Sequence, residues 1–345
     1  MTKPAINVAL PWFADAARDA VERQAWPRLP AFAWLSARGG WSTQGSRSWR
    51  HWLLAKAGVP DPADVLERYA AGPCLALLVA APSDGVAAWA CAQPAHLAAA
   101  LDHLRFATAV LNLSADAESE LLQMLNRHFA DRGLGFERGI AGGWLLRSAA
   151  PVDCVTHDPA AAAGRNVHDF MPAGPDGALV RGIMNEVQML LHEHPVNAQR
   201  QRRGELALNA VWPWGFGTPL RDGTVSRCNA DAMALQAAVL HTDDVWMSGL
   251  WQAHHATARH WSAQPSIPGS REPMFVAVTR PGSPDTASAL ATIDNDLLAP
   301  LQQGVAKGRY GELELLLGSR ILRVTSSARF AFWRRPAAGT QWLQG

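Results

Sequence analysis

The segment from Leu190 to Gly217, LLHEHPVNAQRQRRGELALNAVWPWGFG, carries the densest polar chemistry of the chain. Two histidines flank a glutamate, an asparagine and three arginines follow, and an apolar run then leads into aromatic residues and glycines. Imidazole and guanidinium groups at this density are typical of metal sites, anion sites and acid–base catalysis. The spacing of the residues indicates which of these functions the segment favours.

The two histidines are poorly spaced for a metal bound on a helix. His192 and His194 lie two residues apart, and a helix turns by about 200° over that distance, whereas helical metal-binding pairs prefer positions i and i+4. Pro195 disfavours helix in the residue before it, so we expect a helix to end at His194. In this interpretation His192 faces the edge of the core and His194 caps the carboxyl end of the helix.

An anion suits the segment better than a metal does. His194, Asn197 and the arginines that follow could converge on one phosphate or carboxylate, because the planar guanidinium forms paired hydrogen bonds with such groups. The competing interpretation is that the RQRR run is an ordinary solvated surface. Trp212 or Trp214 could stack on a ligand, or could pack in the core instead. The candidate ligand-binding residues are His192, His194, Asn197, Arg200, Arg203, Asn209 and Trp214.

Other groupings of reactive residues are less specific. The stretch HTDD, from His241 to Asp244, could form a metal or acid–base cluster, although acidic residues in such a position are usually solvated turn formers. The Gly-x-Gly at Gly215 to Gly217 is followed by no phosphate-binding lysine, and the sequence contains no Gly-x-Ser-x-Gly elbow and no Cys-x-x-Cys pair. We therefore expect no catalytic residues, no metal and no cofactor.

The composition narrows the class of protein. The chain has 345 residues, with 31 basic and 30 acidic side chains and a net charge of +1, which argues against general nucleic-acid or membrane-surface binding. No apolar run approaches the roughly 18 residues of a membrane span, and the N-terminus lacks the features of a signal peptide, so we expect a cytoplasmic protein. The 15 tryptophans fit either a large core or a protein-interaction surface.

The predicted elements alternate between strands and helices. An α/β core with a mainly parallel sheet is expected over residues 1–72 and 151–345, and an inserted α+β unit over residues 73–150. The long helix from about residue 178 and the strand that follows it then form one wall of a pocket. Strands are expected at 6–10, 74–81, 85–93, 206–212 and 272–279, with a strand or hairpin within 135–147 and at least two closing strands within 311–335. Helices are expected from 11 to 24, 30–38, 114–132, 178–194, 230–240 and 288–308.

The central segment resembles bacterial regulatory RpfE-type proteins, which are related to the archaeal-type cofactor-independent phosphoglycerate mutases. The chain departs from the pattern at Pro213 and Phe216. WACAQPAHLAAALDHLRF, LLQMLNRHFADRGLGFE and FAFWRR extend the likeness. The matching positions are Asn185, Glu186, Gln188, Met189, His192, His194, Pro195, Val196, Asn197, Arg200, Arg203, Gly204, Asn209, Trp212, Trp214, Gly215 and Gly217.

This resemblance implies an alkaline-phosphatase-like core, and it implies that the catalytic members hold two divalent metals through Asp and His and transfer phosphate through a Ser or Thr. Here Pro11, Trp12 and Phe13 stand where those members have Asp-Gly, and the stretch around Asp285 has no histidine. LLLGSRILR replaces a metal-binding Asp-His pair. A site for two metals needs several carboxylates and imidazoles to balance the charge.

The resemblance and the missing ligands together favour a non-catalytic regulatory protein that binds a small anion or a protein partner. Two alternatives stay open. One is a metal-dependent phosphomutase or phosphatase with a rearranged active site, and the other is a Trp-rich protein-interaction module.

Overall fold

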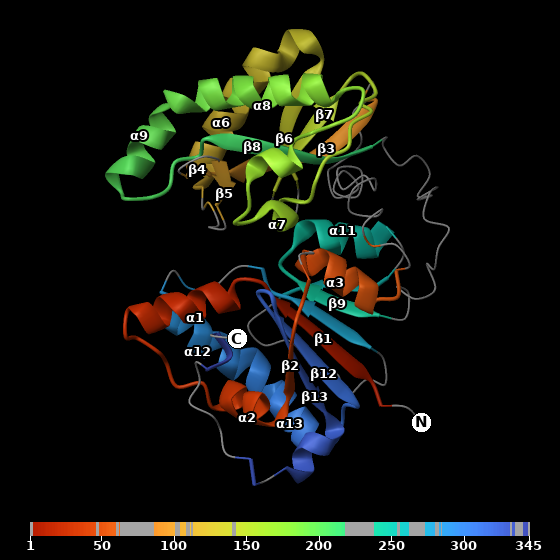
Figure 1. Cartoon of the computed structure of the whole chain (residues 1–345). Coiled ribbons are helices and arrows are strands. Elements are labelled where there is room, and N and C mark those ends of the chain that lie inside the picture. The colour runs from red at the N-terminus through yellow and green to blue at the C-terminus, as the bar shows by residue number, and fades with distance from the viewer. Residues whose placement is uncertain are drawn as a thin grey trace. The chain divides into compact units, whose positions relative to one another are not determined.

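The chain divides into two compact units, Met1–Pro60 with Asn229–Gly345, and Asp61–Cys228 (Figure 1). The first is a layered α/β unit and the second an α+β unit inserted into it. The computed structural model describes residues 3–45, 48–59, 62, 86–100, 104–107, 111, 113–139, 143–217, 238–253, 256–261, 273–279, 283, 285–331, 333–334 and 341–343.

A seven-stranded sheet forms the centre of the first unit, in the order β10-β9-β11-β1-β12-β13-β2. All of its neighbouring strands pair in parallel except β13, which runs antiparallel to both β12 and β2. The sheet is therefore mainly parallel, as the sequence predicts. Its strands are β1 (Ala5–Leu10), β2 (Gly40–Thr43), β9 (Val239–Thr242), β10 (Ala258–His260), β11 (Met274–Ala277), β12 (Glu312–Leu317) and β13 (Arg320–Thr325).

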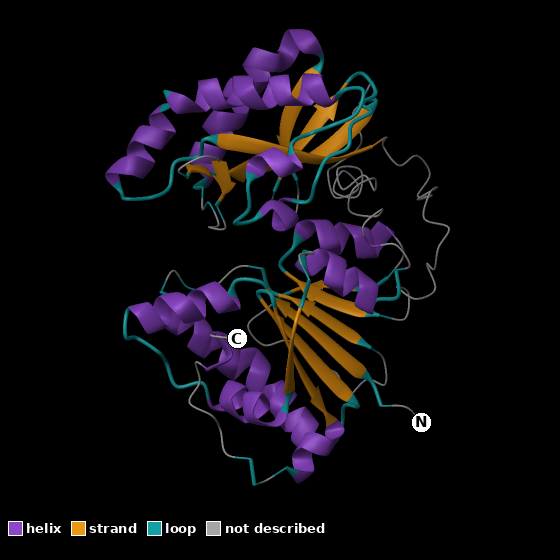
Figure 2. Cartoon of the chain, in the orientation of Figure 1, coloured by secondary structure: helices purple, strands orange, loops and turns teal. Residues whose placement is uncertain are grey.

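Helices cover both faces of this sheet (Figure 2). On one face α1, α2, α12 and α13 pack on a large apolar cluster, and α3 and α11 lie on the other face. A short π-helical segment, Asp294–Leu298, joins α12 to α13. The helices are α1 (Phe13–Glu22), α2 (Pro30–Arg38), α3 (Trp49–Lys56), α11 (Val245–Ala253), α12 (Thr286–Ile293) and α13 (Ala299–Ala306).

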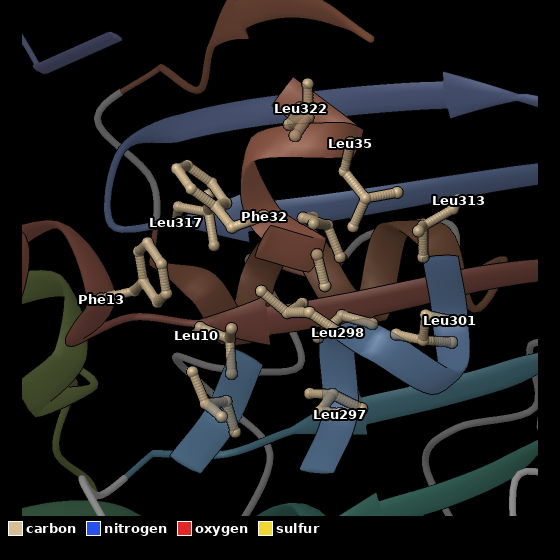
Figure 3. Packing of buried hydrophobic residues seen from close by; sticks show 14 of the residues in the cluster. Leu10, Phe13, Phe32, Leu35, Leu297, Leu298, Leu301, Leu313, Leu317 and Leu322 are labelled. Atoms are coloured by element: carbon tan, nitrogen blue, oxygen red, sulfur yellow. The ribbon is translucent and has the colours of Figure 1, made fainter. Parts of the chain in front are cut away.

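The core of the first unit forms because every second strand residue faces the helices. Figure 3 shows Leu10, Leu313 and Leu317 from the strands in one cluster with Phe13 of α1 and Phe32 of α2. The rings of Phe13 and Phe32 lie 5.2 Å apart between their centroids. Buried leucines at this density supply the main stabilising term for such a unit.

A buried carboxylate fixes α2 against the opposite end of the chain. Asp294 is 1% exposed, and its two oxygens accept hydrogen bonds from the backbone N–H groups of Ala31 (3.1 Å) and Phe32 (2.7 Å). These are first-turn N–H groups that α2 cannot satisfy internally. Asp294 also opens the π-helical segment, so this irregular turn carries the side chain that caps a helix 263 residues away.

The second unit has a four-stranded antiparallel sheet in the order β6-β7-β3-β8, with α6 and α8 packed on one of its faces. Ser114 caps α6 by accepting a hydrogen bond from the N–H of Ala117, as the sequence predicts. The elements are β3 (Ala88–Ala95), β4 (Leu97–Ala99), β5 (Leu104–Phe106), β6 (Leu134–Arg138), β7 (Trp144–Ser148), β8 (Ala210–Gly217), α6 (Ala115–Phe129), α7 (Pro159–Ala162), α8 (Gly177–His192) and α9 (Pro195–Arg202).

The inserted unit is larger than the predicted span of 73–150. Strand β8 pairs with β3 along its whole length, from Ala95↔Ala210 to Trp89↔Gly217, and α8 packs on the same apolar cluster as α6. Residues 151–217 therefore belong with the insert. The sequence did not indicate this, because nothing local in an apolar strand specifies the sheet that it joins.

Two local features also differ from expectation. Pro195 does not end the helical region but starts a new helix, α9, at its first position, where proline is well tolerated. Pro213 lies inside β8, which is an edge strand and so can accept a residue without an N–H. The strand predicted at 74–81 and the helix predicted at 230–240 lie outside the described residues.

No helix within the described ranges combines the length and the apolar character that crossing a bilayer requires.

Replacement of Asp294 by alanine should lower the free energy of unfolding by about 2–4 kcal/mol, since it leaves two buried N–H groups without acceptors. Asp285→Ala is the matched control, because Asp285 caps α12 from an exposed position, and its loss should cost about 1 kcal/mol. Denaturant unfolding measures both. A cost no larger for Asp294→Ala than for Asp285→Ala would contradict the proposed cap.

The contribution of Asp294 to the free energy of unfolding should also depend on pH. Burial raises the pKa of the Asp294 carboxyl above its value in the unfolded chain. The folded wild type therefore holds this proton more tightly, and its stability falls as the pH rises through the folded-state pKa. The stability difference between wild type and Asp294→Ala should accordingly be largest at acidic pH and narrow toward neutral pH.

Candidate functional site

The polar segment singled out by the sequence lies entirely within the second unit, where it forms the end of α8, then α9 and then β8. His192 is the last residue of α8 and is exposed, so it does not face the core edge as expected. His194 caps the amino end of α9, not the carboxyl end of α8. Its Nδ1 accepts a hydrogen bond from the N–H of Val196 (3.3 Å), and its Nε2 lies 3.8 Å from Glu120 Oε1.

Asn197 is the most tightly held member of the set. Its Nδ2 donates to the carbonyl oxygens of Leu191 and Leu208, both at 2.7 Å, and its Oδ1 accepts from the N–H of Leu208 at 2.8 Å. The side chain is buried and joins the end of α8 to the segment that leads into β8. Its amide therefore satisfies backbone groups that would otherwise be buried without partners.

The two arginines of the set have different surroundings. Arg200 is buried, with Nε donating to the carbonyl oxygen of Leu206 (2.7 Å) and Nη1 3.2 Å from Glu205 Oε2. Arg203 is the carboxyl cap of α9 and is exposed. Arg200 thus closes the turn after α9, while Arg203 faces solvent.

The last two members of the set, Asn209 and Trp214, have structural surroundings. Asn209 bonds both backbone groups of Leu97, with Oδ1 accepting from N–H (2.7 Å) and Nδ2 donating to the carbonyl oxygen (2.9 Å). Trp214 is 2% exposed within β8, so it packs in the core and does not present a stacking surface. The N–H of Gly215, whose φ is +65°, donates to Thr156 Oγ1 at 2.8 Å.

The predicted residues therefore do not converge on one anion. Asn197, Arg200 and Asn209 bond to nearby backbone, and His192 and Arg203 are exposed. One member of the set lines a hollow: a surface depression of about 440 Å³ on the outside of α8 is lined by Asn185, Gln188, Met189, His192 and Glu193.

A second candidate location for a functional site is the carboxyl edge of the seven-stranded sheet, because ligands bind at this edge in open parallel α/β sheets. There the indole Nε1 of Trp12, just after β1, donates to the carbonyl oxygen of Val278 beyond β11 (3.0 Å). Asp243, after β9, accepts from the N–H of Thr279 at 2.7 Å. These bonds tie together the ends of three strands.

An ion pair between Arg50 of α3 and Asp244, which follows β9, also lies at this edge. Arg50 Nη2 lies 2.6 Å from Asp244 Oδ2, and both side chains are less than a tenth exposed. Asp244 Oδ1 also accepts from the N–H of Met247 at 2.8 Å, which caps α11. The guanidinium carbon lies 4.9 Å from the ring centre of Trp49 and 5.6 Å from that of Trp246.

The four residues of HTDD thus have separate structural roles rather than one shared ligand. His241 is buried, and burial lowers the pKa of its imidazole, with Arg259 adding to the effect. Thr242 Oγ1 donates to the carbonyl oxygen of Ala277. Within the described residues, no three His, Cys, Asp or Glu side chains are grouped so that they could hold a metal ion.

Arg50 is a residue of the carboxyl edge that the sequence did not reveal. It lies 194 positions before Asp244, so no local spacing links the two. The only signal available was the presence of an acidic pair directly after an apolar strand, which gives one partner of the bond but not the other.

The fold and this edge define a mixed α/β protein with a mainly parallel sheet and an α+β insert, and sequence comparison specifies the class further. The chain is 26% identical over 121 residues to the 2,3-bisphosphoglycerate-independent phosphoglycerate mutase of Methanosarcina barkeri, covering 32% of this chain and 30% of that protein. The mutase of Methanothrix thermoacetophila is 37% identical over 65 residues, 19% and 17% of the two chains. The chain is thus related to phosphoglycerate mutases, and the similarity spans about a third or less of the length of these curated relatives.

Two solved structures resemble the chain loosely. The PH0037 protein of Pyrococcus horikoshii has a TM-score of 0.46 at 13% identity, covering 97% of this chain and 91% of that one. The cofactor-independent phosphoglycerate mutase of Thermoplasma acidophilum has a TM-score of 0.42 at 16% identity, covering 94% and 89%. No family model matches the sequence, and the RpfE-type relationship stays a prediction.

Asn197→Ala should lower the free energy of unfolding by about 2–4 kcal/mol, because it leaves a buried N–H and two buried carbonyl groups without this side chain as their hydrogen-bond partner. His192→Ala should change it by less than about 0.5 kcal/mol, because His192 is exposed and bonds to none of these groups. Urea unfolding measures both variants. Equal effects for the two would show that Asn197 is not the structural link described.

Arg50→Ala should cost about 3–5 kcal/mol, since it leaves the buried Asp244 carboxylate without its counter-charge. The double variant Arg50→Met with Asp244→Asn removes both charges and keeps an acceptor for Met247, so it should recover most of that loss. Urea unfolding of the two proteins tests this. A double variant as unstable as Arg50→Ala would show that the ion pair is not the cause.

Proposed function

We propose that this chain is a phosphoglycerate-mutase-like protein that has replaced two-metal phosphoryl transfer with a binding role in regulation. The observation that carries the proposal is the buried Arg50–Asp244 pair at the carboxyl edge of the sheet. A guanidinium there supplies the positive charge that a divalent cation would supply, and it occupies a carboxylate that a metal would need.

The acidic residues that the structure describes at this edge and nearby do not fit a site for two metals. Asp243 and Asp244 both accept hydrogen bonds from backbone N–H groups, and Asp285 is the exposed cap of α12. Asp15 is exposed on α1 and pairs with Arg18. Two cations about 4 Å apart would need several uncommitted carboxylates and imidazoles converging on one point. These acidic residues are already used for helix capping, a strand-end contact and a surface ion pair.

Other positions named by the resemblance also have structural roles. Trp12 bridges the ends of β1 and β11, where the catalytic members are expected to have Asp-Gly. The stretch LLLGSRILR forms the turn between β12 and β13, with Leu315 paired to Leu322. The regulatory role then depends on a small anion or a protein partner, for which the exposed His192 and Arg203 are the available members of the predicted set.

The tryptophan-rich interaction module has less support. Nine of the tryptophans are buried, and five more are partly buried; only Trp333, 67% exposed, presents a large surface. The tryptophans at the cluster of the first unit stack on one another, as Trp41 does on Trp342 with centroids 5.2 Å apart. Core packing accounts for the high tryptophan content.

The proposal is tested by assaying the purified chain for phosphoglycerate mutase and phosphatase activity with Mn²⁺, Mg²⁺ or Zn²⁺, before and after chelation. Metal binding is followed in parallel by titration calorimetry. We expect no metal-dependent turnover and no stoichiometric binding of two cations, because the carboxyl edge is closed by internal bonds. A catalytic mutase measured side by side serves as the positive control.

Robust turnover that is lost on chelation and restored by metal would overturn the proposal in favour of an enzyme with a rearranged site. In that case Arg50→Met should alter the activity, whereas Arg18→Met, an exposed arginine on α1, should not.

A further inference from the structure

A basic hollow lies at the other edge of the first unit, away from the carboxyl ends of the strands. It has a volume of about 460 Å³. Gly40 begins β2 and pairs with Arg323 on β13, which lies opposite Glu314 in the first half of β12. The basic hollow is defined by the residues that line it, which are Arg38, Gly39, Gly40, Trp41, Ser42, Arg323, Thr325 and Arg334.

The charged side chains that line the hollow are all positive. Three arginines line it and no carboxylate does. Arg323 is balanced by Glu312 and Glu314, which contact its Nε and Nη2. Arg38 lies over the ring of Trp34 with its guanidinium carbon 4.5 Å from the ring centre, and neither Arg38 nor Arg334 pairs with an acid among the described residues.

The backbone of the hollow is open to a ligand at Gly40 but not at the neighbouring Gly39. Gly39 has no room for a side chain, since a Cβ there would lie 2.8 Å from the carbonyl oxygen of Arg323. A Cβ at Gly40 would meet nothing within 4 Å, so this glycine faces open space. Ser42 and Thr325 add hydroxyl groups to the lining, and Thr325 Oγ1 also lies 2.6 Å from Ser327 Oγ. Guanidinium groups from three separate elements, with hydroxyl groups in the same lining, suit an anion that has several oxygens.

We propose that the basic hollow binds a small organic phosphate. Two uncompensated guanidiniums favour a dianionic phosphate group over a single carboxylate. The volume exceeds that of a bare ion many times over, since a water molecule occupies about 30 Å³, and it falls in the range of small-molecule sites. The site is separate from the carboxyl edge, so the inference does not rest on the proposed function.

The test is calorimetric titration of the full chain with glycerol 3-phosphate and with inorganic phosphate at low ionic strength. We expect one site that binds glycerol 3-phosphate, with inorganic phosphate competing more weakly. Arg334→Ala and Gly40→Leu should each weaken binding at least about tenfold, the first by removing a cation and the second by filling the open space. Equal binding of the two probes would reduce the ligand to the phosphate group alone and overturn the organic part of the proposal.

Two matched variants separate a built site from general attraction. Gly45→Leu adds the same side chain at a glycine that also faces open space but lies outside the hollow. Arg28→Ala removes one exposed positive charge elsewhere. Both should bind like the wild type, and circular dichroism should show all four variants folded. Absence of binding to the wild type, or an equal loss with Arg28→Ala, would overturn the proposal.

Discussion

The carboxyl edge of the sheet depends on one buried ion pair, between Arg50 and Asp244. Arg50 belongs to the chain segment before the inserted unit and Asp244 to the segment after it. The pair therefore joins the two halves of the first unit, and it sets the electrostatics where a parallel sheet usually receives its ligand. The Asp244 carboxylate, already neutralised by Arg50, attracts a cation only weakly. This constraint underlies the proposed loss of catalysis and favours binding sites elsewhere on the protein.

The elements of the first unit could largely be predicted from the sequence, because buried parallel strands and amphipathic helices have distinct apolar periods. β1, α1, α2 and β11 follow the predicted order and limits closely. The extent of the insert could not be predicted, because β8 is an apolar strand that either sheet could accept. Its pairing with β3 is a long-range choice set by packing, and α9 was missed because proline starts a helix as readily as it follows one.

The candidate site was harder to predict for a related reason. Residue types in the 190–217 segment indicate polar chemistry, but they do not say whether the partner is a ligand or the backbone. Asn197 and Asn209 each satisfy several backbone groups at the places where α8, α9 and β8 meet other elements, which explains why so many polar residues are needed there. The basic hollow has the opposite character, since its residues come from positions 38–42, 323–325 and 334 and form no pattern in the sequence.

The pairing of Trp89 with Gly217 has a consequence for how the chain is built. These residues lie near the start of the first described strand of the insert and at the end of its last, so these two strand ends lie side by side. Once β3 and β8 have paired, the residues between them no longer add to the length of free chain that the first unit must close, and closure entropy grows with that length. The first unit therefore joins two distant stretches of sequence at a lower entropic cost than their separation along the chain implies.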